Sequence, residues 1–315
     1  MHGPRYRLLG VFFVLGSVAM FVPIRFSTNS GLWDRLMDPL HVPFFGGLTW
    51  LLTLGNPLGI VGHRPRLVAA IVLSILAAAA VEIIQPLTGR QESWLDLRDG
   101  LLGIVLTAAL LWRPAGKRSA GFVAGWMAAL LIVALVALQP AWQEARGMIW
   151  RTRHFPLLAD FESDDELRLW ECSALDERTF MDSAMLASPL HAAHGGHSLL
   201  VRTAPAAWPG VRLLCADQDW RGYGALAFDV FTPDEPFDLG IRIDDDASQG
   251  GHDARFNHTV PVQHGWNHIR IRLAEIEHGP HARALRMSAI RRVVFFRDHP
   301  TDRRSFFLDY LRLER

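Results

Sequence analysis

Hydrophobic residues form long runs in the first half of the chain and alternate with polar residues in the second half. Before residue 140 the runs approach the roughly 20 residues that an α-helix needs to cross a bilayer. We expect five membrane-spanning helices, near residues 8–24, 41–61, 67–85, 95–112 and 121–139. The first run is followed by Val22-Pro23-Ile24 and not by a cleavage site of small residues, so we interpret it as an uncleaved helix.

From about residue 157 the apolar and polar positions alternate with a period of two. Leu239, Ile241 and Ile243, for example, are separated by Gly240 and Arg242, which is the pattern of a strand with one buried face. Strands are expected at 198–203, 211–215, 226–230, 239–243, 256–262, 269–273, 292–296 and 306–313. Many short strands separated by turns are typical of a sandwich or jelly roll.

The predicted fold is therefore multi-domain. We expect an α-helical transmembrane bundle in residues 1–139, a juxtamembrane linker in 140–156, and an all-β jelly-roll or sandwich domain in 157–315. The overall composition agrees with this division, since 50% of the 315 residues are hydrophobic and only 20% are charged. The formal net charge of +0 gives no basic field for binding nucleic acid.

Basic residues in the short loops predict the orientation in the membrane. They precede the first span and lie between the second and third and the fourth and fifth spans: Arg5, Arg7, His63, Arg64, Arg66, Arg113, Lys117 and Arg118. Cytoplasmic loops carry an excess of Lys and Arg. We therefore expect a multi-pass protein of the cell membrane, with a cytoplasmic N-terminus and an extracytoplasmic β domain.

A set of polar residues stands at the ends of the predicted spans, all on the extracytoplasmic side. Asp38 and His41 are three residues apart, as are Glu82 and Gln85, so each pair shares one helix face. The candidate catalytic cluster comprises Glu82, Arg90, His41, Asp38, Gln85 and Asp96. A carboxylate beside hydrocarbon is costly unless it is paired or solvated, so this cluster could transfer protons or clamp an anion. Ordinary helix-end charges that only hold loops together are the alternative.

The order of these residues resembles the VanZ-like membrane family over about residues 8–112. The resemblance rests on Asp38-x-x-His41, Glu82-x-x-Gln85, Arg90, and Asp96 with Gly103. Two positions depart from the family: Pro39 replaces its usual Lys, and Gly100 replaces an Asn amide. The family is named after a member linked to resistance to the glycopeptide teicoplanin. The resemblance therefore implies a role in the cell envelope and not a particular reaction.

The second half resembles the galactose-binding-like jelly rolls of carbohydrate-binding modules. Candidate ligand-binding residues are Trp220, Arg242, Asp244, Asp246, Arg255 and Asn257, with Arg297 and His299 of matching type. Sugars need an aromatic face to stack on and polar groups for their hydroxyls. The resemblance also implies a structural Ca²⁺ held by Glu162 and Asp309, since hard cations prefer carboxylate oxygens. No other cofactor is evident.

Cysteine and histidine positions each leave two interpretations open. Cys172 and Cys215 either form a disulfide, as an extracytoplasmic domain allows, or stay as two buried thiols. His191, His194 and His197 invite a zinc site, but the intervening Gly195-Gly196 favours a solvated loop.

Three functions fit this sequence. The first is an envelope protein whose β domain binds a glycan or another envelope component, with the lipid bilayer as a further partner. The second is a membrane enzyme or transporter that acts on a lipid-linked envelope precursor through Glu82, Arg90 and His41. The third is a scaffold that binds only protein.

Overall fold

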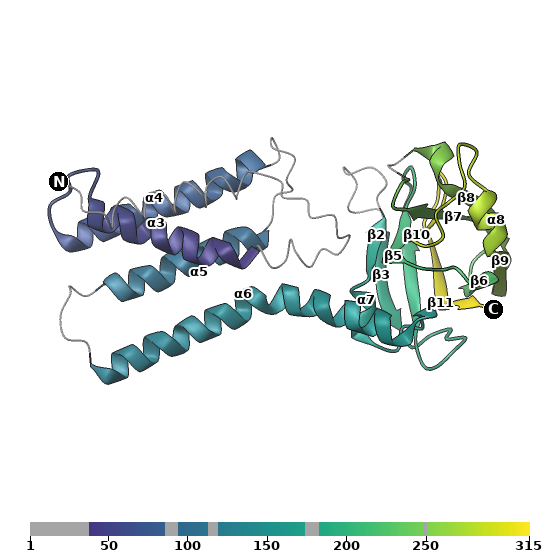
Figure 1. Ribbon diagram of the computed structural model, residues 1–315, viewed down its shortest axis with the longest axis horizontal. Coiled ribbons are helices and arrows are strands. Elements are labelled where there is room, and N and C mark those ends of the chain that lie inside the picture. Colours follow the sequence, from purple (N-terminus) through teal and green to yellow (C-terminus); the bar gives the residue numbers. More distant parts are fainter. Residues whose placement is uncertain (1–37, 86–93, 113–118, 174–182, 249–250) are drawn as a thin grey trace. The chain divides into compact units, whose positions relative to one another are not determined.

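The computed structural model describes residues 38–85, 94–112, 119–173, 183–248 and 251–315. They form two compact units, a helical one and a β one, with the boundary between Trp142 and Gln143 (Figure 1). The expected first span, residues 8–24, lies outside the described residues. Helices occupy the positions of the other four expected spans, and strands follow from Leu157 onward.

The described residues of the helical unit form a short 3-10 helix and four α-helices. The elements are η1 (Asp38–Leu40), α3 (His41–Gly55), α4 (His63–Ile84), α5 (Trp94–Leu111) and α6 (Ala120–His154). α6 continues through Pro140, so most of the stretch that we expected to be a linker, residues 140–156, is helical. One proline removes only one main-chain hydrogen bond, and the alanines and leucines on both sides of it favour helix.

Two helices of the described part are long and apolar enough to cross a membrane, α4 with 22 residues and α6 with 35. Only 22% and 11% of their most apolar stretches are buried, so most of their apolar side chains face outward. α3 is 15 residues long, and α5 carries Asp96, Arg98 and Asp99 near its start. Of the five expected spans, two therefore have the length and composition to cross a membrane, and α3 and α5 are present as helices.

Glycine residues allow α3 and α5 to pack closely. A Cβ at Gly46 would lie 2.8 Å from the Thr107 hydroxyl oxygen, and one at Gly100 would lie 2.8 Å from the ring of Phe45. Small residues let the backbones of two helices approach each other. α4 joins the same core through a buried row of residues, Leu67, Ala70, Ser74 and Ala78. The start of α3 and the start of α5 are therefore held side by side.

The β unit is an antiparallel sandwich of two sheets (Figure 1). Sheet A has the order β3-β4-β11-β6-β9, with β1 also paired to β11. Its strands are β1 (Leu157–Ala159), β3 (Ser183–Ser188), β4 (Ser198–Thr203), β6 (Ala225–Thr232), β9 (Gly265–Arg272) and β11 (Arg304–Glu314). The predicted β-sandwich fold is confirmed.

Sheet B has the order β2-β5-β10-β7-β8. Its strands are β2 (Trp170–Ser173), β5 (Gly210–Gln218), β7 (Phe237–Asp245), β8 (Phe256–Val262) and β10 (Ile290–Phe296). Three short helices lie between strands: α7 (Asp164–Leu167), η3 (His252–Ala254) and α8 (Leu273–His278). Side chains of both sheets fill one core, in which Phe228 and Phe295 meet with ring centroids 5.1 Å apart.

The two cysteines are free thiols, so the structure favours the second of the two interpretations. Cys172 of β2 pairs in register with Val211 of β5, and Cys215 lies four residues farther along β5. Four residues of strand span about 13 Å, whereas the Cα atoms of a disulfide lie within about 7 Å. The register of these two strands therefore keeps the sulfur atoms apart.

Candidate functional site

Residues of three helices meet at one end of the helical unit. His41 begins α3, Asp96 lies in the first turn of α5, and Glu82 lies in the last turn of α4. Glu82 follows Ser74 and Ala78 at a spacing of four, so it continues the buried face of α4. One ligand atom from each of the three side chains lies within 4.8 Å of the other two. His41 and Asp96 are each 2% exposed, so two of the three side chains are buried.

The hydrogen bonding of His41 fixes the roles of its ring nitrogens. Nδ1 lies 2.8 Å from the carbonyl oxygen of Asp38. A carbonyl oxygen only accepts, so Nδ1 must carry a hydrogen and donate it. Nε2 is directed to the other side, 3.7 Å from Oδ2 of Asp96. The imidazole is thus held so that Nε2 faces the two carboxylates.

The remaining members of the predicted cluster are placed around this centre. Asp38 and Gln85 are buried at the ends of η1 and α4. Arg90 lies outside the described residues. Asp99 of α5 is fully buried and accepts a 2.8 Å hydrogen bond from Nε of Arg98.

A second group of functional side chains lies on sheet B, on the face turned away from the core. Core residues such as Ile241 and Phe295 alternate with residues of this face along each strand. We call it the arginine face, and its residues are Arg212, Arg242, Asp244, Arg255, Asn257, Arg292 and Phe296. The strand register brings them together, because Arg292 is opposite Asp244 and Arg242 is opposite Asn257.

Asp244 is the centre of the arginine face and is 1% exposed. It accepts a hydrogen bond from Nε of Arg242 at 2.9 Å, and Nε of Arg292 also donates to it. Arg255 lies near the same three groups. Burial lowers the pKa of Arg255 first of all, and the charges of Arg242 and Arg292 lower it further, while Asp244 opposes the shift. Arg242 and Arg292 therefore both hydrogen-bond Asp244, and Arg255 lies close enough for its charge to interact with all three groups.

A glycine on a neighbouring strand makes room for an aromatic ring beside these charges. Phe296 of β10 is opposite Gly210 of β5 and Gly240 of β7. A Cβ at Gly240 would lie 2.5–2.8 Å from the three outermost ring carbons of Phe296, so the ring covers this glycine. The ring is half-buried, and its neighbour Phe295 belongs to the core. Phe296 thus supplies an aromatic surface on the arginine face.

Most of the sequence-predicted ligand residues meet on this face, and two do not. Arg242, Asp244, Arg255 and Asn257 are brought together by β7 and β8. Trp220 is 0% exposed and packs in the core, so its ring offers no face to a ligand. Asp246 lies beyond the end of β7, where it pairs with Arg286.

One further predicted residue lies away from the arginine face, and three residues of that face were not predicted. Arg297 is buried, donates to Thr203 Oγ1 at 3.2 Å and pairs with Asp302, so it holds loops together. Sequence reasoning missed Arg212, Arg292 and Phe296. Their signal was the alternation within the two strands predicted at 211–215 and 292–296, which places them opposite the core side chains.

Glu162 and Asp309, the predicted calcium ligands, both accept hydrogen bonds from the loop between β3 and β4. Glu162 Oε1 accepts from the N–H groups of Gly196 and His197, each at 2.7 Å. Asp309 Oδ2 accepts from Ala193 at 2.6 Å and His194 at 2.9 Å. These oxygens face N–H dipoles that repel a cation, so the arrangement does not fit a calcium ion. Burial raises the pKa of Asp309 to about 6, against the effect of these N–H groups.

The three loop histidines have separate partners. His191 stacks on Phe231 with ring centroids 3.7 Å apart, and His194 stacks on Tyr310 at 4.2 Å. His197 lies 3.4 Å from Glu162. Their rings turn to different neighbours, so this loop does not gather them as zinc ligands.

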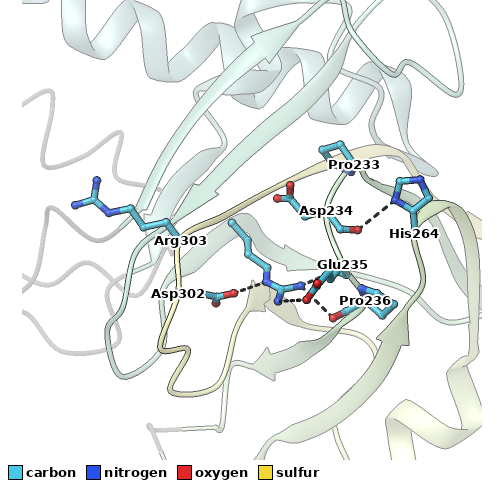
Figure 2. Close-up of a pocket in the computed structure, with 8 residues that line it drawn as sticks. Pro233, Asp234, Glu235, Pro236, His264, Asp302 and Arg303 are labelled. Atoms are coloured by element: carbon cyan, nitrogen blue, oxygen red, sulfur yellow. Dashed lines mark hydrogen bonds and ion pairs between the residues drawn. The ribbon is translucent and has the colours of Figure 1, made fainter.

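A pocket opens where three loops of the β unit meet (Figure 2). It is lined by Pro233, Asp234, Glu235, Pro236, His264, Asp302, Arg303 and Arg304. Arg304 donates to the Pro236 carbonyl at 3.0 Å and to Asp302 at 2.6 Å, and His264 lies 3.3 Å from the Asp234 carbonyl. These polar groups hold the loops to one another, and Arg303 points away from them (Figure 2).

Comparison with known proteins gives similarity only for the β unit. No family model matches the chain, and no curated protein matches it. The VanZ-like resemblance of the first half and its link to glycopeptide resistance therefore stay predictions.

Among solved structures, the C-terminal half is similar to carbohydrate-binding modules. One is the family 11 module from Clostridium thermocellum in complex with a β-1,3-1,4-mixed-linked tetrasaccharide, with 15% identity and a TM-score of 0.39 over 50% of this chain and 94% of that chain. Another is the C-terminal family 22 module of Clostridium thermocellum Xyn10B, with 15% identity and a TM-score of 0.34 over 49% of this chain and 89% of that chain.

An exo-β-agarase is also similar, with 14% identity and a TM-score of 0.39 over 50% of this chain. The match spans 24% of the agarase.

Proposed function

We propose that this chain is a membrane-anchored carbohydrate-binding protein whose arginine face binds an anionic glycan. The observation that carries the proposal is the grouping of three guanidinium groups, those of Arg242, Arg255 and Arg292, beside Asp244, where their charges repel one another. A bound carboxylate, sulfate or phosphate group would relieve the repulsion among these guanidinium groups. Planar guanidinium groups also bind such anions through two parallel hydrogen bonds.

The residues of the arginine face differ in how far their side chains are exposed, and this suggests different roles in binding. Arg242 and Asp244 are 4% and 1% exposed and form a fixed floor. The side chains of Arg212 and Arg292 are each 33% exposed, so both reach solvent, and Arg212 also pairs with Glu171 at 2.6 Å. A ligand group that approaches the floor therefore meets cations that are already oriented, which lowers the entropy cost of binding.

Phe296 and Asn257 supply the other two features that sugar recognition needs. The half-buried ring of Phe296 can stack on the apolar face of a sugar ring. The exposed Asn257 amide donates to the His252 carbonyl at 3.0 Å and accepts from Arg255 Nε at 3.2 Å, and its oxygen keeps a second lone pair for a sugar hydroxyl. An aromatic platform beside hydrogen-bonding groups and cations suits a saccharide that carries acidic groups.

Anchoring in a membrane is supported by the outward-facing apolar side chains of two helices. On α4 these are Val68, Val72, Ile75, Leu76 and Ile83, and on α6 they are Val123, Met127, Leu131, Ile132, Leu135 and Leu138. Contiguous apolar surface on this scale is rare in soluble monomers and marks membrane or partner contact. The basic loops predict that the β unit is extracytoplasmic, where envelope polysaccharides are found.

Binding is tested with the full-length chain in detergent against a panel of polysaccharides. Polygalacturonate and alginate represent acidic glycans, and mixed-linkage β-glucan represents a neutral one. We expect binding to the acidic polymers that weakens as salt rises, because exposed charges are screened. Binding to the neutral polymer alone, or no binding by folded protein, contradicts the proposal.

Neighbouring arginines provide a matched pair of variants. Arg292→Ala removes a cation of the arginine face, whereas Arg291→Ala removes the next residue, which pairs with Asp217 at 3.0 Å. Loss of a hydrogen bond to a charged group costs about 1.5–3 kcal/mol, or roughly 10–100-fold in affinity. We expect this loss for Arg292→Ala and little change for Arg291→Ala. Equal effects of the two substitutions would argue against a site on this face.

The membrane topology has its own test. Reporters that are active only in the cytoplasm or only outside it are fused after Lys117 and after Arg315. A cytoplasmic signal at Lys117 with an extracytoplasmic signal at Arg315 agrees with the proposal. A cytoplasmic signal at Arg315 would place the arginine face away from envelope glycans.

A further inference from the structure

A buried polar cluster lies in the helical unit, whereas the arginine face belongs to the β unit. His41, Glu82 and Asp96 come from α3, α4 and α5, and they offer one nitrogen and two oxygen ligand atoms that lie within 4.8 Å of one another. A metal site needs ligand atoms that converge on one point, as these three do. The cluster is not a local run of acidic residues, because each group stands on a different helix.

His41 is oriented as a metal-binding histidine. Its Nδ1–H donates to the Asp38 carbonyl at 2.8 Å, which directs the lone pair of Nε2 toward Asp96 and Glu82. Histidines that bind metals usually donate their other ring N–H to a carbonyl or carboxylate, which fixes the ring and its tautomer. Phe45 stacks beside the imidazole, with ring centroids 6.2 Å apart, and limits its rotation.

Burial shields this place from water. His41 and Asp96 are each 2% exposed. Metal ligands bind with the imidazole neutral and the carboxylates ionised, so two carboxylates would offset the charge of a divalent cation bound by all three groups.

We infer that His41, Glu82 and Asp96 bind one divalent first-row transition-metal ion, such as Zn²⁺, Mn²⁺ or Fe²⁺. The imidazole disfavours Ca²⁺ and Mg²⁺, which prefer oxygen ligands alone, and the donor set contains no thiolate to select Cu(I). Three protein ligands leave at least one coordination position for water or a substrate. Glu82 is the half-buried member, so the open position lies on its side of the cluster.

Metal content of the full-length, tag-free chain in detergent tests this site. After loading with Zn²⁺ or Mn²⁺ and removal of excess metal, elemental analysis should find one ion per chain. Asp96→Asn and His41→Ala should weaken binding by about tenfold or more, since loss of outer-shell partners alone costs about 10–100-fold. The control is His63→Gln in the same unit, because Nε2 of His63 lies 2.6 Å from the Leu111 carbonyl, outside the cluster.

Cobalt gives a readout that does not depend on loss of binding. Co²⁺ bound to wild-type protein should show visible d–d bands that Zn²⁺ removes by competition. In His41→Cys the bound Co²⁺ should gain an intense thiolate charge-transfer band in the near ultraviolet, which shows direct coordination at residue 41. No cobalt bands in the folded wild-type chain, or the same metal content in wild type, Asp96→Asn and His41→Ala, would overturn the inference.

Discussion

The backbone of Val42 in α3 and Gly103 in α5 approach so closely that a Cβ at residue 103 would lie 3.0 Å from the Val42 Cα and closer still to its carbonyl oxygen. Real Cβ atoms do not lie this close to backbone, so any side chain at residue 103 must push the two helices apart. The contact lies next to His41 and on the same helix as Asp96. The distance between these two polar residues therefore depends on the absence of a side chain at Gly103.

Gly103→Ala should lower the stability of the helical unit by about 1–3 kcal/mol, the usual cost of overpacking. The measurement is the thermal unfolding midpoint of the full-length chain in detergent. Gly125→Ala on α6 is the control, because a Cβ there meets no atom within 4 Å and alanine favours helix. A Gly103→Ala protein as stable as Gly125→Ala would show that the α3–α5 contact can relax without cost.

Glu166 should make the stability of the β unit depend on pH. Burial raises the pKa of Glu166 from 4.5 to about 7. This happens although the carboxyl group accepts hydrogen bonds from the backbone N–H groups of Asp160 at 2.9 Å and Ser163 at 3.2 Å. The unfolded chain releases this proton near pH 4.5 and the folded chain near pH 7. The contribution of protonated Glu166 to the free energy of unfolding is therefore complete below pH 4.5. As the pH rises through 7, this contribution of about 3 kcal/mol is lost.

The change of the free energy of unfolding with pH is the slope to be measured. Near-ultraviolet circular dichroism during denaturation at several pH values gives it, because Trp170 and Trp220 are buried in the β unit. Glu166→Gln should flatten the slope, whereas Asp164→Asn on the same short helix should retain it, since Asp164 is exposed. A slope that is unchanged in Glu166→Gln would assign the pH dependence to another group.

Asp244→Asn should destabilise the β unit by about 3–5 kcal/mol, because it leaves buried Arg242 without its carboxylate partner. The matched control is Asp238→Asn, on the same strand β7 but exposed, which should change stability by less than about 0.5 kcal/mol. Denaturant unfolding of the full-length chain checks both values. Similar midpoints for the two variants would mean that the floor of the arginine face adapts to the loss of charge.

Both cysteines should remain thiols after purification without reductant. Alkylation under denaturing conditions should add two labels per chain, as intact mass will show. In the folded chain Cys215 should resist alkylation, because complete burial raises the pKa of its thiol to about 12. A chain that takes up labels only after reduction would mean that the strand register of β2 and β5 differs from the one described here.

Periodicity predicted the local elements well, for a simple physical reason. Residues that alternate between apolar and polar, as Leu239 to Ile243 do, can bury one side only as a strand, and runs such as 67–85 satisfy their backbone as helices. These choices depend on neighbouring residues alone. For the same reason the four helices and the predicted strands occur where the sequence placed them.

Pro140 and Trp220 show the limits of local patterns. Residues 140–156 were predicted to be a linker, but α6 continues through Pro140 to His154 because the flanking residues favour helix. The tryptophan suggested a sugar-stacking surface, but the fold places it in the core. A large aromatic ring suits either position, and only the packing of the two sheets decides between them.

The sequence by itself determined the elements, the division into helical and β parts, and the polar residues at the helix ends. Tertiary structure decided which of these residues meet. β10 lies between β5 and β7 in sheet B although it follows both in sequence, and this order brings Arg292 to Asp244 and sets the register that keeps Cys172 from Cys215. The glycines of α3 and α5 bring His41 to Asp96. Distances between elements depend on such non-local packing, which no local pattern of residues encodes.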